Sequence, residues 1–257
     1  MEIIEYCDKD GLRNGFCIQK WKDGRLLEGY YLKNRINGWA IINKPEINIV
    51  GEFSEDIING YAEVFYKSEN KRIKSYWNNG NLDDIGIEYG SDYFYEGNFK
   101  NGEKDGYGKQ VWNDNEIYEG EWKCAKYDGY GIYYYSNGKK YIGEWRNSMK
   151  NGFGKLIWPN GKIYVGFFKD DQIHGFGIYY LFKDCYIINF WKNGKRHGLG
   201  KYIKENNIYY GNWEESKLIE NMNLLEFMDS FNDENKNYLF MFQWSIKEIN
   251  QFIFFDE

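Results

Sequence analysis

The stretch that decides the fold runs from residue 118 to residue 140 and reads YEGEWKCAKYDGYGIYYYSNGKK. Tyr118, Gly120 and Trp122 alternate with two glutamates, which is the period-two pattern of a strand with one apolar face. The stretch Gly131-Ile132-Tyr133-Tyr134-Tyr135 is typical of a second strand. The Asp, Lys and Gly residues between the runs, and the Ser-Asn-Gly after them, belong to hairpin loops. The stretch therefore predicts one β-hairpin.

The same phrase recurs along the chain, and its clearest copies begin at residues 95, 118, 141 and 164, a strict period of 23. The phrase is Tyr-x-Gly-x-aromatic, then a glycine seven residues later, often followed by x-Gly. Its structural glycines are Gly97, Gly106, Gly120, Gly129, Gly143, Gly152, Gly166 and Gly175. We expect aromatic rings to cross the backbone at Gly120 and Gly129, where a Cβ would collide. Copies are degenerate over residues 1–94 and clear over 95–213, which predicts about ten hairpins of 22–24 residues.

A lone hairpin is marginally stable in water, so each unit depends on its neighbours. The sequence predicts a mainly β fold, an elongated single-layer antiparallel sheet of tandem hairpins over residues 1–216. Residues 217–257 break the phrase and predict a short helical segment, with helices at 217–231 and 238–254 and a polar turn at 232–237. This segment is either a cap on the last hairpin or a detachable element that binds a partner.

The phrase Tyr-Glu-Gly-Glu-Trp followed by Asp/Asn/His-Gly-x-Gly resembles the MORN repeat (membrane occupation and recognition nexus), most specifically over residues 95–200. His174 and His197 precede the late glycine, where that family commonly has histidine. The resemblance implies a scaffold of tandem MORN repeats that docks partner helices, assembles with itself, or sits at membrane-linked and cytoskeletal structures. It also implies a cytoplasmic location, associated with the cytoskeleton or a cilium.

The residues point to a non-enzymatic protein. The chain has two histidines and lacks phosphate-cradling, GxSxG and HExxH motifs, so we predict no catalytic residue, no cofactor and no metal site. Its formal net charge of −6 gives no basic field for nucleic acid. No signal peptide or membrane span is apparent. The cysteines lack CxxC spacing and are expected to be reduced, buried or half-buried thiols; they are Cys7, Cys17, Cys124 and Cys185.

An aromatic stripe along the repeats is the predicted binding surface. A single-layer sheet cannot bury both faces of its own strands, so we expect part of the stripe to stay exposed as a groove for a partner helix or an extended peptide. The aromatic stripe consists of Tyr95, Phe99, Tyr118, Trp122, Tyr141, Trp145, Tyr164, Phe168 and Trp191.

Charge is distributed in blocks. Residues 139–204 carry 13 basic and 4 acidic side chains, whereas residues 1–138 carry 17 and 24, and residues 205–257 carry 3 and 11. The basic set consists of Lys139, Lys140, Arg146, Lys150, Lys155, Lys162, Lys192, Lys195 and Arg196. Three interpretations stay open, namely a solvated surface, a dock for an acidic protein, and contact with anionic lipid headgroups. We predict a protein-binding scaffold, with a peripheral membrane tether as the alternative and self-assembly left open.

Overall fold

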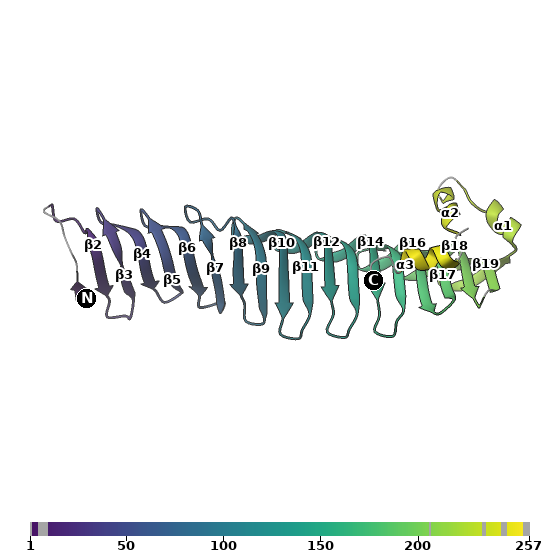
Figure 1. The fold of residues 1–257 in the computed structure, drawn as a ribbon, viewed down its shortest axis with the longest axis horizontal. Coiled ribbons are helices and arrows are strands. Elements are labelled where there is room, and N and C mark those ends of the chain that lie inside the picture. The colour runs from purple at the N-terminus through teal and green to yellow at the C-terminus, as the bar shows by residue number, and fades with distance from the viewer. Residues whose placement is uncertain (1, 5–9, 206, 233–234, 243–245, 254–257) are drawn as a thin grey trace. The chain divides into compact units, whose positions relative to one another are not determined.

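The computed structural model describes residues 2–4, 10–205, 207–232, 235–242 and 246–253. The chain forms two compact units, residues 1–126 and 127–257, and each unit is an open antiparallel β-meander (Figure 1). From β1 to β11, and again from β12 to β20, every strand pairs antiparallel with the next strand in the chain. The predicted mainly β fold of tandem antiparallel hairpins is confirmed.

The first unit contains β1 (Glu2–Ile4), β2 (Gly15–Lys20), β3 (Leu26–Leu32), β4 (Arg35–Asn43), β5 (Ile47–Ser54), β6 (Ile57–Tyr66), β7 (Lys71–Trp77), β8 (Ile85–Tyr89), β9 (Tyr93–Lys100), β10 (Glu103–Trp112) and β11 (Ile117–Lys123). The second unit contains nearly all of β12 (Lys126–Tyr134), then β13 (Lys140–Arg146), β14 (Met149–Ile157), β15 (Ile163–Lys169), β16 (Gln172–Phe182), β17 (Cys185–Lys192), β18 (Lys195–Lys204), β19 (Asn207–Glu214) and β20 (Lys217–Met222). Its helices are α1 (Leu224–Asp229), η1 (Lys236–Tyr238), α2 (Leu239–Phe242) and α3 (Ile246–Ile253).

Two kinds of turn alternate from β12 to β16, and from β16 onward two residues separate each strand from the next. One is a two-residue turn such as Asn147-Ser148, whose φ angles of 51° and 63° are those of a type I′ hairpin. The other is a five-residue connection between strands, as at 158–162, where Gly161 has φ 79° and Trp158 N donates to Lys162 O at 2.9 Å. The hairpin loops expected between the two strand runs of each phrase are much shorter. Between β9 and β10, for example, Asn101 and Gly102 alone make the turn, and the strands continue on both sides.

The aromatic stripe packs on one face of the sheet in each unit, which we call the inner face. The Tyr141 ring lies 5.1 Å from Phe168 of the next hairpin, and Tyr164 lies 5.9 Å from Trp191, in both cases nearly perpendicular. The Tyr141 hydroxyl also donates to Glu144 O at 2.9 Å. Each tyrosine is therefore covered by the aromatic ring of the following hairpin, and a single layer of strands acquires a core.

The glycines of the phrase serve two different purposes. A Cβ on Gly154 would lie 2.5 Å from the Tyr141 hydroxyl, because the ring lies directly over this backbone. Gly152 instead has φ 81°, in the left-handed region that favours glycine, and the pairing of β13 with β14 shifts register there. Gly129 has φ 111°, so its backbone conformation also favours glycine, and ring crossing there stays a prediction.

The C-terminal segment differs from its prediction. Residues 217–222 form β20 rather than helix, because Glu215 and Ser216, with φ 49° and 67°, turn the chain back onto β19. Helix begins only at α1, where the Asn223 side chain accepts from Glu226 N at 3.0 Å and the Glu226 carboxylate accepts from Asn223 N at 2.9 Å. The second predicted helix is divided among η1, α2 and α3; residues 243–245 and 254, and 233–234 of the predicted turn, lie outside the described residues.

The helices pack against the sheet face opposite the aromatic stripe, which we call the outer face. Their buried side chains Phe227, Phe242, Ile249 and Ile253 join one apolar cluster with outer-face residues of β15–β18. That cluster contains Ile163, Val165, Phe176, Ile178, Tyr186, Ile188, Leu199 and Ile203. The segment therefore covers strand faces rather than only the edge of the last hairpin.

Candidate functional site

The aromatic stripe is the core of the inner face. All nine of its side chains are at most 9% exposed. Rings at this depth contact one another and the backbone, so the expectation that the stripe lies open to a partner is corrected. The exposed apolar surface of the sheet lies elsewhere.

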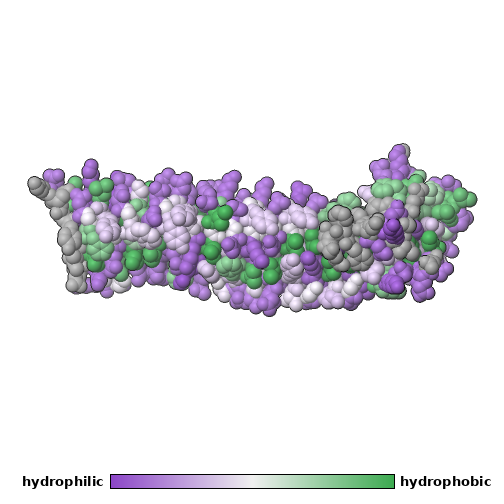
Figure 2. Space-filling model, viewed as in Figure 1, coloured by the Kyte–Doolittle hydropathy of each residue, from purple (hydrophilic) through white to green (hydrophobic). Residues whose placement is uncertain are grey.

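That surface is a row of residues at the position between the two late glycines of each hairpin, which we call the outer row. It consists of Phe16, Trp39, Tyr61, Ile85 and Tyr107 in the first unit and of Tyr130, Phe153, Phe176 and Leu199 in the second. Phe16, Trp39, Tyr107, Tyr130 and Phe153 are 39–57% exposed. In the view of Figure 2, strongly hydrophilic side chains gather toward the turn ends of the strands, and less hydrophilic ones lie between them.

The helical segment occupies the outer row of the second unit at Phe176 and Leu199, which are 3% and 7% exposed. The Tyr238 ring stacks on Phe176 at 5.0 Å and 18° and meets Phe190 edge-on at 5.4 Å. Phe242 also contacts Phe176, at 5.3 Å. A pair of rings on adjacent strands, Phe176 and Phe190, thus forms a platform on which a helical segment docks.

Two polar contacts hold the same segment. The buried Lys201 ammonium donates to Phe242 O at 2.8 Å, and the Tyr186 hydroxyl donates to Asn250 Oδ1 at 2.6 Å. Burial lowers the pKa of Lys201 and raises that of Tyr186. The segment is therefore fixed by specific hydrogen bonds as well as by apolar packing.

The next platform along the row is exposed. Phe153 and Phe167 face each other on β14 and β15 with ring centroids 5.5 Å apart, the spacing of Phe176 and Phe190, and they are 39% and 37% exposed. A groove of about 630 Å³ runs between Phe167 and the Tyr238 ring. Its lining includes Arg146, Met149, Lys169, Asp170 and His174.

A comparison with known protein families identifies the type of repeat. The family model described as MORN repeat matches residues 9–24, 95–117, 118–140, 141–163, 164–184 and 190–207. The chain belongs to the MORN-repeat family. The matched segments follow the 23-residue phrase from residue 95 onward, whereas the MORN hairpins between residues 25 and 94 are too degenerate to match.

One solved structure similar to this MORN protein is the TCP domain of SAS-4 (dCPAP) in complex with a proline-rich motif of Ana2 (dSTIL) of Drosophila melanogaster. The two chains are 14% identical, the match covers 74% of this chain and 90% of that chain, and the TM-score is 0.27. So low a score carries no argument about function. No curated protein sequence matches the chain.

The basic set does not form one surface of the MORN hairpins. Lys139, Lys140 and Lys162 lie at the five-residue connections, whereas Arg146, Lys192, Lys195 and Arg196 lie at the opposite, two-residue turns. Lys155 is buried, and Lys150 lies within the inner face, 2.7 Å from Asp171. Lys195 pairs with Glu215. The set is therefore divided between two ends of the strands and the interior.

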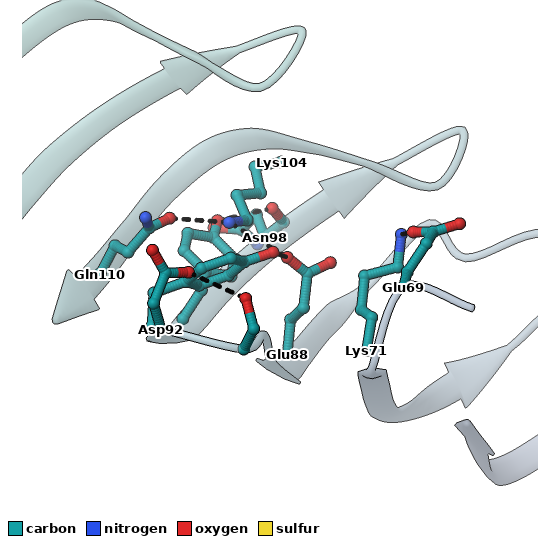
Figure 3. A network of polar contacts seen from close by, with 10 residues as sticks. Glu69, Lys71, Glu88, Asp92, Asn98, Lys104 and Gln110 are labelled. Carbon is teal, nitrogen blue, oxygen red and sulfur yellow. Dashed lines mark hydrogen bonds and ion pairs between the residues drawn. The ribbon is translucent and has the colours of Figure 1, made fainter. Parts of the chain in front are cut away.

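Cations are part of the inner face of this MORN fold. Lys104 lies 4.1 Å from the Tyr93 ring centroid and 3.1 Å from Glu88 Oε1, and it donates to Gln110 at 2.7 Å (Figure 3). Burial lowers the pKa of Lys104, and Glu88 opposes that shift. Lys150 occupies the same repeat position and lies over three aromatic rings. These pairs could not be predicted from the residue pattern, since charge on a strand usually indicates a solvated face.

The remaining candidates from the sequence are metal ligands, membrane-spanning segments and cysteines. Within the described part of the chain, no three His, Cys, Asp or Glu side chains are placed to hold a metal ion. No helix among the described residues is long and apolar enough to span a membrane. Cys17 and Cys185 are buried free thiols, but Cys124 is exposed, because it stands in a two-residue turn with φ 48°. Cys7 lies outside the described residues.

Proposed function

We propose that this MORN protein is a non-enzymatic scaffold that binds a helix of a partner protein on the outer face of its second unit. The observation that carries the proposal is the repetition of one ring platform. At Phe176 and Phe190 it is occupied by the chain's own helical segment, and at Phe153 and Phe167 the same platform is exposed beside a groove.

The partner is an amphipathic helix with aromatic residues on its apolar side, because the rings that the platform already accepts are those of Tyr238 and Phe242. Arg146 and Lys169 at the groove favour acidic residues on the flank of that helix. The MORN resemblance makes cytoskeletal and ciliary proteins the first candidates, in a cytoplasmic setting.

Quantitative co-purification from cells that express the protein tests this function. The variant Phe153→Ser/Phe167→Ser removes the exposed platform, and Phe182→Ser, an exposed phenylalanine of the same unit off the row, is the matched control. Circular dichroism first establishes that both variants fold. We expect the double variant to lose a defined set of partners by at least about tenfold, as for a buried aromatic anchor, and the control to retain them. Equal recovery with both variants would remove the outer row from the proposal.

The alternative function is a peripheral membrane tether acting through the basic set. Division of that set between both ends of the strands works against a single lipid-facing surface. Co-sedimentation with anionic and with neutral liposomes at low salt separates the two functions, because electrostatic attraction is strongest there. Binding that requires anionic lipid and survives Phe153→Ser/Phe167→Ser would favour the tether.

A further inference from the structure

In the last hairpin of the second unit, the tyrosine equivalent to the stripe tyrosines lacks the covering ring that they have. Tyr141 and Tyr164 are fully buried, because an aromatic ring of the following hairpin lies over each of them. Tyr209 holds the same position in β19 but is 50% exposed. Its ring stacks only loosely on Tyr202, with centroids 6.0 Å apart.

A groove of about 600 Å³ lies beside this tyrosine. Its walls include Tyr202, Tyr209, Trp213 and Leu218, and its charged lining residues are Arg196 and Lys204. No carboxylate lines it among the described residues. Arg196 lies over the Trp213 ring at 5.4 Å. The groove is thus aromatic and cationic, which suits an aromatic side chain with acidic neighbours.

The strand beside the groove has an available edge. β20 pairs with β19 on one side, and no other strand of the described residues pairs with its second side. Residues 217–221 are exposed, including Leu218 at 53% and Ile219 at 59%. An exposed apolar strand edge is a template for pairing with another extended segment.

The register of the preceding hairpins indicates where an added strand must have an aromatic residue. In each of them an aromatic residue of the incoming strand pairs with the first late glycine, as Trp145 pairs with Gly129, Phe168 with Gly152 and Trp213 with Gly198. In β20 Asn221 pairs with Gly211 as Gly154 pairs with Gly143, so the position equivalent to Gly152 is Ile219, two residues before Asn221. A strand added to β20 with an aromatic residue opposite Ile219 would place that ring on the inner face, over Tyr209.

We propose that the edge of β20 and the groove at Tyr209 bind an extended segment of a partner protein, which adds as an antiparallel strand and inserts a Trp or Phe flanked by acidic residues. A second copy of β20 fits poorly, because this strand contributes Leu218 and Met222 but no aromatic residue. This site is separate from the outer row and does not depend on the proposed function.

The probe is a fluorescein-labelled peptide of residues 116–123, EIYEGEWK, because it is extended in the first unit and carries three glutamates and a Trp. Fluorescence anisotropy with the full chain measures its binding. We expect the same peptide with Trp122→Ser to bind at least about tenfold more weakly. Two further peptides are N-methylated at odd or at even positions, and one of the two should lose binding, since only alternate N–H groups pair with an adjacent strand.

Protein variants locate the site. Tyr209→Ser should weaken binding at least about tenfold, whereas Ile208→Ser, its exposed neighbour on the opposite face of β19, should leave binding unchanged. If Tyr209→Ser fails to fold, Leu218→Glu, which places a carboxylate in the groove, replaces it with the same expected loss. Phe153→Ser/Phe167→Ser should have no effect on this peptide.

Three results would overturn the proposal. The first is no measurable binding of the unmodified peptide to the folded chain. The second is equal binding of both N-methylated peptides, which would exclude strand pairing. The third is a dimer, seen by light scattering, that the peptide dissociates and that Tyr209→Ser abolishes, because a second copy would then be the natural occupant.

Discussion

The buried tyrosines of the second unit should make its free energy of unfolding fall at alkaline pH. Burial raises the pKa of Tyr141 and Tyr164 far above the ordinary value of 10.0. Above pH 10 the tyrosines of the unfolded chain release their protons, while these two keep theirs in the folded unit. The unfolded state then binds fewer protons, so the free energy of unfolding falls as pH rises.

The magnitude follows from proton counting. Each such tyrosine lowers the free energy of unfolding by about 1.4 kcal/mol per pH unit above pH 10, so the pair lowers it by about 3 kcal/mol per unit. Lys201 acts in the opposite direction, because its lowered pKa adds stability as pH rises, but only up to its unfolded value of 10.5. Between pH 10.5 and about pH 12 the tyrosines therefore dominate.

Urea denaturation followed by circular dichroism, repeated across this pH range, measures the slope. Tyr141→Phe keeps the ring but loses the hydrogen bond to Glu144 O, so it should cost about 1 kcal/mol at neutral pH and reduce the alkaline slope by about 1.4 kcal/mol per pH unit. A folded protein in which the tyrosinate absorbance of all 25 tyrosines rises around pH 10 would refute the reasoning. An unchanged slope in Tyr141→Phe would do so as well.

Three further outcomes are expected. Gly154→Ala should lower the free energy of unfolding by about 3 kcal/mol in urea denaturation, because its Cβ would meet the buried Tyr141 ring. Gly161→Ala should lower it by about 1 kcal/mol, because a Cβ there has open space but the backbone has φ 79°. Lys104→Met leaves the Glu88 carboxylate buried without its ammonium and should cost about 3 kcal/mol in the same assay, with partial recovery on adding Glu88→Gln. A thiol reagent should modify Cys124 in the native protein within minutes, and equal reactivity of the two buried cysteines would contradict the described packing.

The repeat was predictable because its signal is geometric. A ring that covers a backbone requires glycine beneath it, and a two-residue turn favours residues with positive φ, so both leave a fixed spacing in the sequence. The fold class and the hairpins from residue 95 to residue 213 follow from that spacing. The end of the array was misjudged, because Leu218, Met222 and Leu225 fit a helical period, while pairing with β19 selects a strand for residues 217–222.

The binding surface could not be found in the same way. Alternation shows that two faces of a strand differ, but not which face is buried. Tyr141 looks like an exposed ring until the next hairpin is placed over it. Phe153 and Phe176 occupy one repeat position, and the rings of Tyr238 and Phe242 cover only Phe176, which makes one exposed and the other buried.

Covering each stripe tyrosine with a ring from the following hairpin has a consequence for how such a chain changes length. Within the second unit, removing one complete 23-residue period would bring Tyr141 under Trp191 in place of Phe168, a contact of the same kind. Duplication would insert another such contact and leave the rest untouched. Inserting a repeat after β20 would bury Tyr209 and leave the tyrosine of the inserted repeat without a covering ring. The uncovered tyrosine is therefore a property of the last hairpin. Each time the gene gained or lost a period, the tyrosine of the new last hairpin would be the exposed one.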